Sequence, residues 1–270
     1  MAYPGVRRPR PGHASAPGPP EPPNAAKKER PADWFFDVRR FRANHKDFDD
    51  ESLILGIDEA GRGPVIGDMV YAAALISLAE HERLRRCGVA DSKTLNDKMR
   101  AACRAKLEAL ASPCGDDNAG DAPSFVALTL PIHADVISEA MLGRTGKSLN
   151  TVSHQAAVSL IEAATLLGRG RLCAVFVDTV GPPDTYQRFL KGRFPHLHVV
   201  VSAKADARFP IVSAASIFAK TERDASVARL GVNCGSGYPA DARTVAFLNG
   251  EGCGLNRFFG FRWDELRHSC

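Results

Sequence analysis

The residues best suited to chemistry lie in segment 56–64, Gly-Ile-Asp-Glu-Ala-Gly-Arg-Gly-Pro, which follows the apolar run Leu53–Leu55. Asp58 and Glu59 are therefore expected at the end of a short buried strand, where an unpaired carboxylate is costly. A bound cation is the simplest compensation. The Gly-Arg-Gly sequence that follows offers backbone N–H groups and one guanidinium, which suit phosphate or hydroxyl groups. The segment predicts a metal-binding acid pair beside a loop that reads nucleic acid.

Two more acids follow apolar runs. Asp178 comes directly after Val175–Val177, and Asp206 lies shortly beyond His198–Val201. Because parallel or mixed sheets bind ligands at the carboxyl ends of their strands, both acids are expected to converge with the first pair. Four carboxylates in one cleft repel one another unless cations neutralise them, and oxygen ligands suit Mg²⁺ or Mn²⁺ rather than zinc. Two ions about 3.5–4 Å apart would stabilise the attacking water and the leaving oxygen of a phosphodiester.

An acid after a strand can also be a helix N-cap or a turn residue. This capping interpretation is adopted for Asp97, Asp184 and Asp241. For Asp178 both interpretations stay open, whereas two adjacent acids at 58 and 59 are harder to explain as caps. His154 is interpreted as a hydrogen-bonded interior residue, because no second histidine lies at helical metal-binding spacing.

Two other segments have possible binding roles. Ala90–Lys93 could simply start a helix, or Ser92 and Lys93 could hold a phosphate at that helix N-terminus. The glycine-rich turn Gly235–Pro239 carries Tyr238. This tyrosine could anchor the turn, or it could stack on a sugar or base and read a 2′-hydroxyl.

Five apolar or β-branched runs predict strands that must position these residues. They are Leu53–Ile57, Met69–Ile76, Phe125–Leu130, Cys173–Val177 and His198–Val201. Three stretches predict helices: one that begins with a capping box at Thr94-x-x-Asp97, one from Asn150 as a possible cap to Gly168, and Ser213–Leu230. The pattern predicts an α/β fold with a mixed sheet flanked by helices.

Charge and proline content separate a tail from a body. Residues 1–47 hold ten Lys or Arg and five Asp or Glu. Residues 48–270 hold 25 Lys or Arg and 26 Asp or Glu, so the positive charge is concentrated in the first segment. Nine of the 18 prolines lie in residues 1–32, where they disfavour helix and strand. We expect residues 1–47 to be a disordered basic tail that ends in an aromatic strap, and residues 48–270 to form one folded domain with a C-terminal helical region. The strap is expected to pack on the domain edge, with partner binding as the alternative.

Composition also excludes several classes of protein. No apolar run approaches the roughly 20 residues of a membrane helix. The seven cysteines are odd in number and form no C-x-x-C pair, which argues against a zinc site or a disulfide framework. No secretory signal is visible, so a reducing intracellular compartment fits.

Five segments together resemble the type 2 ribonuclease H family (ribonuclease HII). They are G-I-D-E-A-G-R-G-P, A-D-S-K-T-L, V-D-T-V-G-P, K-A-D-A with F-P-I-V-S-A-A-S-I-F-A-K-T-E-R-D, and G-S-G-Y-P-A-D, in the family's order over roughly residues 52–248. Each alone is weak evidence, but the set is specific. K-A-D-A and V-D-T-V-G-P-P-D-T-Y are most similar to the branch that contains the catalytic A subunit of the eukaryotic enzyme.

The resemblance implies a ribonuclease H-like fold and metal-dependent hydrolysis of RNA in RNA–DNA hybrids, with incision 5′ to single ribonucleotides in duplex DNA. The catalytic metal ligands would be Asp58, Glu59, Asp178 and Asp206. The contacts to the 2′-hydroxyl and adjoining backbone would come from Gly61, Arg62 and Gly63. Tyr238 would pack at the RNA–DNA junction, and Lys93 would contact a phosphate, with Lys220 and Arg223 as further candidates for that contact.

The expected function is therefore an endonuclease of DNA replication and ribonucleotide excision repair that uses two Mg²⁺ or Mn²⁺ ions. Its expected partners are the nucleic-acid substrates and two accessory subunits, as in the eukaryotic heterotrimer. The expected location is the nucleus, or an organelle reached through the tail. One alternative is a ribonuclease H-like resolvase or transposase, which shares the carboxylates but needs no Gly-Arg-Gly with a paired Tyr. The other is a non-catalytic nucleic-acid-binding protein, which loss of a carboxylate would favour.

Overall fold

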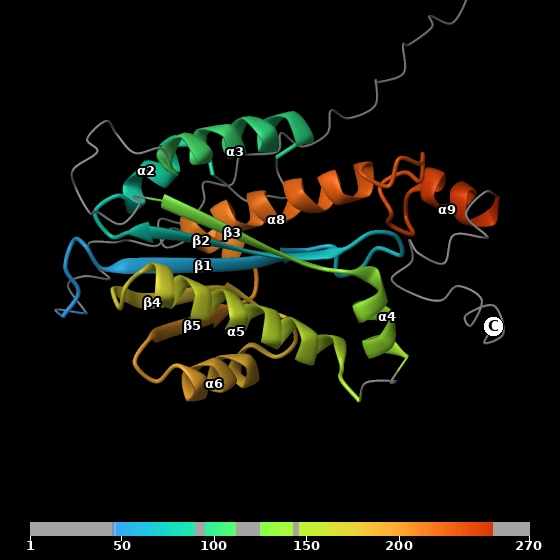
Figure 1. Ribbon diagram of the computed structural model, residues 1–270. Helices are drawn as coiled ribbons and strands as arrows, with labels where there is room; N and C mark the ends of the chain where they lie inside the picture. Colours follow the sequence, from blue (N-terminus) through green and yellow to red (C-terminus); the bar gives the residue numbers. More distant parts are fainter. Residues whose placement is uncertain (1–44, 46, 90–94, 112–124, 143–145, 251–270) are drawn as a thin grey trace, which may run out of the picture. The chain divides into compact units, whose positions relative to one another are not determined.

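Five strands form one mixed sheet in the order β3-β2-β1-β4-β5 (Figure 1). The computed structural model describes residues 45, 47–89, 95–111, 125–142 and 146–250, which all lie in one compact unit. The strands are β1 (Leu53–Ala60), β2 (Met69–Ser77), β3 (Phe125–Ile132), β4 (Leu172–Asp178) and β5 (His198–Ser202). Strand β2 runs antiparallel to β1 and β3, whereas β4 is parallel to β1 and β5. The carboxyl ends of β1, β4 and β5 therefore meet at one edge.

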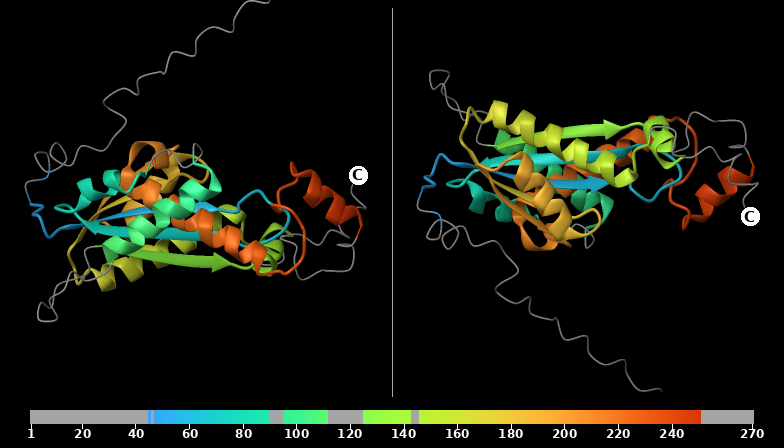
Figure 2. Two further views of the ribbon diagram at one scale, coloured as in Figure 1. Left: turned by 90° about the horizontal axis from the view of Figure 1, so that it is seen from above. Right: turned by 90° about the horizontal axis from the view of Figure 1, so that it is seen from below.

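Helices cover both faces of the sheet (Figures 1 and 2). One face packs against α2 (His81–Arg86), α3 (Asp97–Ala111) and α8 (Pro210–Ala228). The other packs against α4 (Ala134–Met141), α5 (Leu149–Leu167) and α6 (Pro183–Arg193). The short α7 (Ala205–Arg208) follows β5, and α9 (Ala242–Asn249) packs near the carboxyl end of β1 through a small separate cluster.

Strand alternation decides which face each residue of β1 serves. Ile54 lies in the apolar core under α8, whereas Leu55 and Ile57 lie in the core under α5 and α6. Because successive side chains of a strand point to opposite faces, Asp58 is directed to the α8 side and Glu59 to the α5 side. The two acids are adjacent in sequence but enter the candidate site from opposite faces of the sheet.

All five predicted strands are confirmed, and each extends beyond the predicted bounds. The largest extension is that of β1, which continues to Ala60, so the acid pair lies inside the strand and is hydrogen-bonded to β2 rather than placed after the strand's end. This pairing fixes the backbone of both acids, and it leaves only their side chains to adapt to a ligand.

The helices are confirmed, but three of their starts differ from the prediction. Ser148, not Asn150, caps α5, because its hydroxyl accepts from Thr151 N at 3.1 Å. Asn96 accepts from Met99 N at 2.9 Å at the start of α3, while the predicted cap Thr94 lies outside the described residues. Helix α8 begins at Pro210 rather than Ser213, since proline suits a first turn in which its missing N–H costs nothing.

The predicted division into a tail and a domain is still a prediction. Apart from His45 and Asp47, residues 1–47 lie outside the described residues, as do residues 251–270 of the predicted C-terminal region. Within the described part of the chain, four cysteines are free and buried. No described helix is long and apolar enough to cross a bilayer.

The contact between β1 and α8 depends on Gly56. A Cβ at this position would lie 2.4 Å from the backbone carbon and oxygen of Ile211 and 2.6 Å from Val212 N. Only glycine allows a strand and a helix backbone to approach this closely. The contact sets the height of α8 above the strand that carries Asp58.

We predict that Gly56→Ala lowers the free energy of unfolding by about 3 kcal/mol or more, because both obstructing groups are backbone and neither can rotate away. Urea denaturation measures the change. Gly192→Ala is the matched control: no atom lies within 4 Å of its added Cβ, and it is expected to be neutral or to stabilise α6 by up to about 1 kcal/mol. Equal effects of the two substitutions would contradict the close approach.

Candidate active site

The structure brings the four predicted acids to one edge of the sheet. Asp58 and Asp178 lie near the carboxyl ends of the neighbouring parallel strands β1 and β4, where Ile57 pairs with Val177. Asp178 in turn pairs with Ser202, the last residue of β5. Asp206 follows in α7 and is buried. Three separate strand ends thus deliver acids to the same place.

Asp178 holds the start of α7 in addition to lying at the site. Its Oδ1 accepts a hydrogen bond from Ala205 N at 2.8 Å. Lys204, just before this N–H, adopts a left-handed conformation with φ 56°, which is unfavourable for a residue with a Cβ and redirects the chain after β5. The capping and ligand interpretations of Asp178 are compatible, because a carboxylate has about four acceptor sites. Asp178 therefore also determines where Asp206 lies.

Electrostatic repulsion acts on the two strand acids. Burial, followed by Asp178 and Asp206, raises the pKa of Asp58 from 3.8 to about 7, although Ser216 and Lys220 of α8 oppose the shift. Burial, followed by Asp58 and Asp178, raises the pKa of Glu59 well above its usual value, with Arg62 opposing. The ionised forms of Asp58 and Glu59 are both costly in this environment, so a cation at the edge would relieve the repulsion between their carboxylates.

The acids fit a divalent ion in their chemistry. All four offer oxygen only, and Glu59 Oε2 is buried without a hydrogen-bond partner. This donor set is what Mg²⁺ and Mn²⁺ prefer. Across the described ranges, no three His, Cys, Asp or Glu side chains converge closely enough to enclose one ion. The side chains of Asp58 and Glu59 point to opposite faces of the sheet, which explains why they do not converge. An ion bound at the edge must therefore bring the two carboxylates together from the two faces.

The Gly-Arg-Gly loop that follows β1 has two distinct parts. Gly61 has φ 85°, and a Cβ there would lie 2.4 Å from Asp68 O, so the turn requires glycine. The Arg62 guanidinium points into the protein, where it donates to Ser153 Oγ at 2.7 Å and to Asn150 Oδ1 of α5. At Gly63 an added Cβ would meet no atom within 4 Å. The loop backbone, rather than Arg62, is thus the part suited to contact a ligand.

A second turn, which carries Tyr238, is bonded to this loop. Val65 N donates to Gly237 O at 2.8 Å, and Ser236 N donates to Asp241 Oδ2 at 2.7 Å, where Asp241 also caps α9 as predicted. Tyr238 itself is 38% exposed, so one part of its ring is available to a ligand. The two candidate recognition segments therefore form one connected unit.

Arg223 of α8 holds this unit together. It is 3% exposed, donates to Ser236 O, and places its guanidinium carbon 4.6 Å from the centre of the Tyr238 ring. The sequence suggested a phosphate contact for Arg223, and burial excludes that role in this arrangement. Lys220, the other such candidate, acts electrostatically on Asp58.

The inward roles of Asn150, Ser153 and Arg223 were not predicted from the sequence. A signal was present for Arg223, because positions 216, 220 and 223 share one face of α8 by helical spacing. For Asn150 and Ser153 no local signal exists, since their partner Arg62 is far away in sequence. Lys93 lies outside the described residues.

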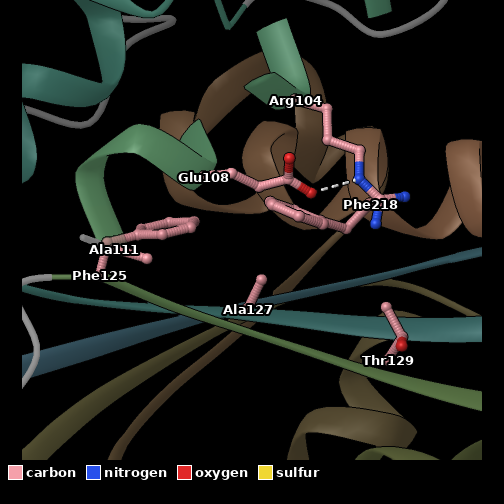
Figure 3. A pocket seen from close by; sticks show the side chains of 7 residues that line it. All are labelled: Arg104, Glu108, Ala111, Phe125, Ala127, Thr129 and Phe218. Atoms are coloured by element: carbon pink, nitrogen blue, oxygen red, sulfur yellow. Dashed lines mark hydrogen bonds and ion pairs between the residues drawn. The ribbon is translucent and has the colours of Figure 1, made fainter. Parts of the chain in front are cut away.

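The prediction of a hydrogen-bonded interior histidine is met only in part, because His154 is half-buried and its Nε2 has no hydrogen-bond partner among the described residues. Its ring stacks on Tyr186 with centroids 4.1 Å apart, and burial lowers its pKa. A pocket of about 280 Å³ lies elsewhere, between α3, β3 and α8 (Figure 3). Arg104 and Glu108 form an ion pair at 2.7 Å in its wall, and it contains none of the four acids. The candidate site is therefore the strand edge and not this pocket.

Comparison with known proteins gives one consistent result. A family model described as Ribonuclease HII matches residues 55–266. The chain is similar to the A subunit of Ribonuclease H2 from Bos taurus, at 44% identity over 78% of this chain and 69% of the relative, and to that from Homo sapiens, at 42% over 79% and 71%. The fold is similar to a solved structure of the PCNA:RNase HII complex from Archaeoglobus fulgidus, with a TM-score of 0.62 and 30% identity over 78% of this chain and 95% of that one.

We predict that the contribution of Asp58 to the stability of the metal-free protein falls as pH rises from about 4 to about 7. The native state holds protons on Asp58 that the unfolded chain has released above pH 3.8, so the stabilisation present at low pH is lost through this window. Asp58→Asn should remove part of this dependence and raise the melting temperature at pH 8. Relief of a single pKa unit corresponds to about 1.4 kcal/mol, or roughly 3–6 °C.

Thermal melts in EDTA between pH 4 and pH 8 measure this effect. Asp184→Asn, which changes an exposed acid at the start of α6, is the matched control and should shift stability by less than about 0.5 kcal/mol. A variant Asp58→Asn that melts below the parent protein at pH 8 would show that repulsion does not dominate at this edge.

Proposed function

Because this chain belongs to the ribonuclease HII family, we propose that Asp58, Glu59, Asp178 and Asp206 form its catalytic metal site. The protein is an endoribonuclease that cleaves RNA in RNA–DNA hybrids and at ribonucleotides embedded in duplex DNA. One observation carries the proposal: acids from three parallel strand ends meet at one edge, where burial and then the neighbouring acids raise the pKa of Asp58 and of Glu59.

Two Mg²⁺ or Mn²⁺ ions held by these acids would supply Lewis-acid activation of water and stabilisation of the leaving oxygen. The chain contributes position and charge. Strand pairing fixes the backbone of Asp58 and Glu59, and Asp178 anchors the turn that presents Asp206. Lys220 places one positive charge beside Asp58, which limits the repulsion without neutralising four acids. Cleavage would occur 5′ to the ribonucleotide and leave 3′-hydroxyl and 5′-phosphate ends.

The connected loop and turn would supply the selectivity for RNA. DNA lacks the 2′-hydroxyl, so a selective enzyme needs a polar group placed against the sugar. We assign this to the backbone at Gly61–Gly63 and to the Tyr238 hydroxyl, with the ring packed on the neighbouring deoxyribose. The connection of loop and turn through Arg223 favours this function over a resolvase or transposase. The presence of all four acids favours it over a non-catalytic binding protein.

Partners and location are part of the proposal. The mammalian relatives are named as one subunit of Ribonuclease H2, and the archaeal relative was solved in a complex with PCNA. We propose that this chain is the catalytic component of an assembly with two accessory proteins and acts in the nucleus. The basic residues of segment 1–47 would serve nuclear import, with organellar targeting as the outcome to be tested with a reporter fusion.

We predict that Asp206→Asn lowers cleavage of a duplex with one ribonucleotide by more than about 100-fold in Mg²⁺. Removal of residues around metal ligands already costs roughly 10–100-fold, and loss of a ligand charge should cost more. The assay compares Mg²⁺ with EDTA, which should abolish cleavage by the parent protein, and uses Asp184→Asn as the control for loss of an acid. Near-normal turnover of Asp206→Asn at saturating Mg²⁺ would remove Asp206 from the metal site.

We predict that Tyr238→Ala lowers kcat/KM on a single-ribonucleotide duplex more than on a long RNA–DNA hybrid, with Tyr238→Phe intermediate. Phe keeps the ring and loses one neutral hydrogen bond, worth about 0.5–1.5 kcal/mol. Arg223→Lys should shift the same ratio, because Lys keeps the charge but not the planar group that lies over the ring. Equal losses on both substrates would leave Tyr238 as a structural turn residue.

A further inference from the structure

Glu59 lies beside two buried tyrosines on the α5 side of the sheet. Tyr71 and Tyr186 are each 1% exposed, and neither hydroxyl has a hydrogen-bond partner among the described residues. Glu59 Oε2 is also buried and unpartnered. Native interiors leave few polar groups unpartnered, so three of them around one carboxylate require an explanation. We call Glu59, Tyr71 and Tyr186 the tyrosine cluster.

Strand register places Tyr71 against Glu59. The two residues are direct partners across the antiparallel pair β1 and β2, so their side chains lie on the same face with Cβ atoms roughly 4.5–5.5 Å apart. Glu59 acts electrostatically on Tyr71 and on Tyr186, and each tyrosine also feels Arg62. Ser153 also acts on Tyr71, but its hydroxyl is neutral and also accepts from Arg62 at 2.7 Å. Glu59 is therefore the anion that both phenols face.

Tyr186 is held in place by aromatic stacking. Its ring stacks on His154 of α5 at 4.1 Å with an interplanar angle of 11°, and His154 stacks in turn on Phe189 at 5.2 Å. The sandwich joins α5 to α6 and prevents the phenol from swinging away from the sheet. The hydroxyl thus has a fixed position, which is what a residue that orients another side chain requires.

Both hydroxyls are donors at neutral pH. Burial, followed by the charge of Glu59, raises the pKa of Tyr71 and of Tyr186 well above the usual value for tyrosine. A protonated phenol beside a carboxylate donates to it, and such a bond to an ionised acceptor is stronger than a neutral one.

We propose that Tyr71 and Tyr186 are positioning residues for Glu59, and that their hydroxyls donate to Oε2 through a bridging water, so that Oε1 faces the other acids at the strand edge. The inference rests on the proposed function, since it assigns a task to Glu59 as a metal ligand. Without these donors the carboxylate can rotate about its side-chain bonds, and ion binding must then supply the cost of ordering it.

The test is removal of each hydroxyl with the ring retained, by Tyr71→Phe and Tyr186→Phe in the full chain. Mn²⁺ titration followed by electron paramagnetic resonance, without nucleic acid, measures ion affinity directly. We expect each variant to bind Mn²⁺ roughly ten-fold more weakly than the parent protein. The Mg²⁺ concentration for half-maximal cleavage should rise by a similar factor, while the rate at saturating Mg²⁺ recovers.

Two comparisons make the result decisive. In a Glu59→Gln background, Tyr186→Phe should cause no further loss of Mn²⁺ affinity, because the group that it positions has lost its charge. Thr165→Val removes a hydroxyl of α5 that bonds only within the helix and should leave Mn²⁺ affinity unchanged. Melting curves in EDTA confirm that every variant is folded.

The outcomes separate this inference from the proposed function. If Glu59→Gln weakens Mn²⁺ binding but neither Tyr→Phe substitution does, the positioning role is wrong and the metal site stands. If Glu59→Gln itself leaves Mn²⁺ affinity unchanged, the proposed ligand role of Glu59 fails. If Tyr→Phe lowers only the melting temperature, the tyrosines serve packing alone and the inference is overturned.

Discussion

At Gly56 the backbone of α8 lies directly on β1, and the parts of the candidate site are positioned through this contact. Strand β1 carries Asp58 and Glu59. Helix α8 carries Ser216 and Lys220, which lie near Asp58, and Arg223, which packs against the Tyr238 ring. A side chain at position 56 would push helix and strand apart and move all of these together. One missing Cβ thus couples the geometry of the metal site to that of the recognition turn.

The fold accepts an electrostatic penalty at this edge. Apolar packing on both faces of the sheet fixes the strands. Because β1, β4 and β5 are parallel, their acids lie at the same edge even though the carboxylates repel one another. Lys220 and Arg62 offset part of the penalty, while burial and then the neighbouring acids raise the pKa of Asp58 and of Glu59. Such local cost at an otherwise consistent fold is typical of functional sites. A divalent ion would reverse it, so ion binding and stability should be linked.

The polar residues around the site each have a structural task as well. Asp178 anchors α7, Asp241 caps α9 and receives the Tyr238 turn, and Arg62 ties its loop to α5. Because these bonds join segments that are distant in sequence, the recognition loop and the acid edge form one rigid arrangement. The two interpretations of Asp178 that the sequence left open are compatible, since a carboxylate can accept a backbone bond and still face an ion.

The sequence by itself determined the strands, the mixed sheet and the convergence of four acids, because hydrophobic periodicity and motif order are local properties of the chain. Its motifs also indicated the family. Only the tertiary structure decided that Asp58 and Glu59 enter from opposite faces, that Ser148 rather than Asn150 caps α5, and that Arg223 supports Tyr238 instead of reaching a phosphate. It alone revealed the tyrosine cluster around Glu59. Such facts depend on register and on contacts between distant segments, which no local pattern encodes.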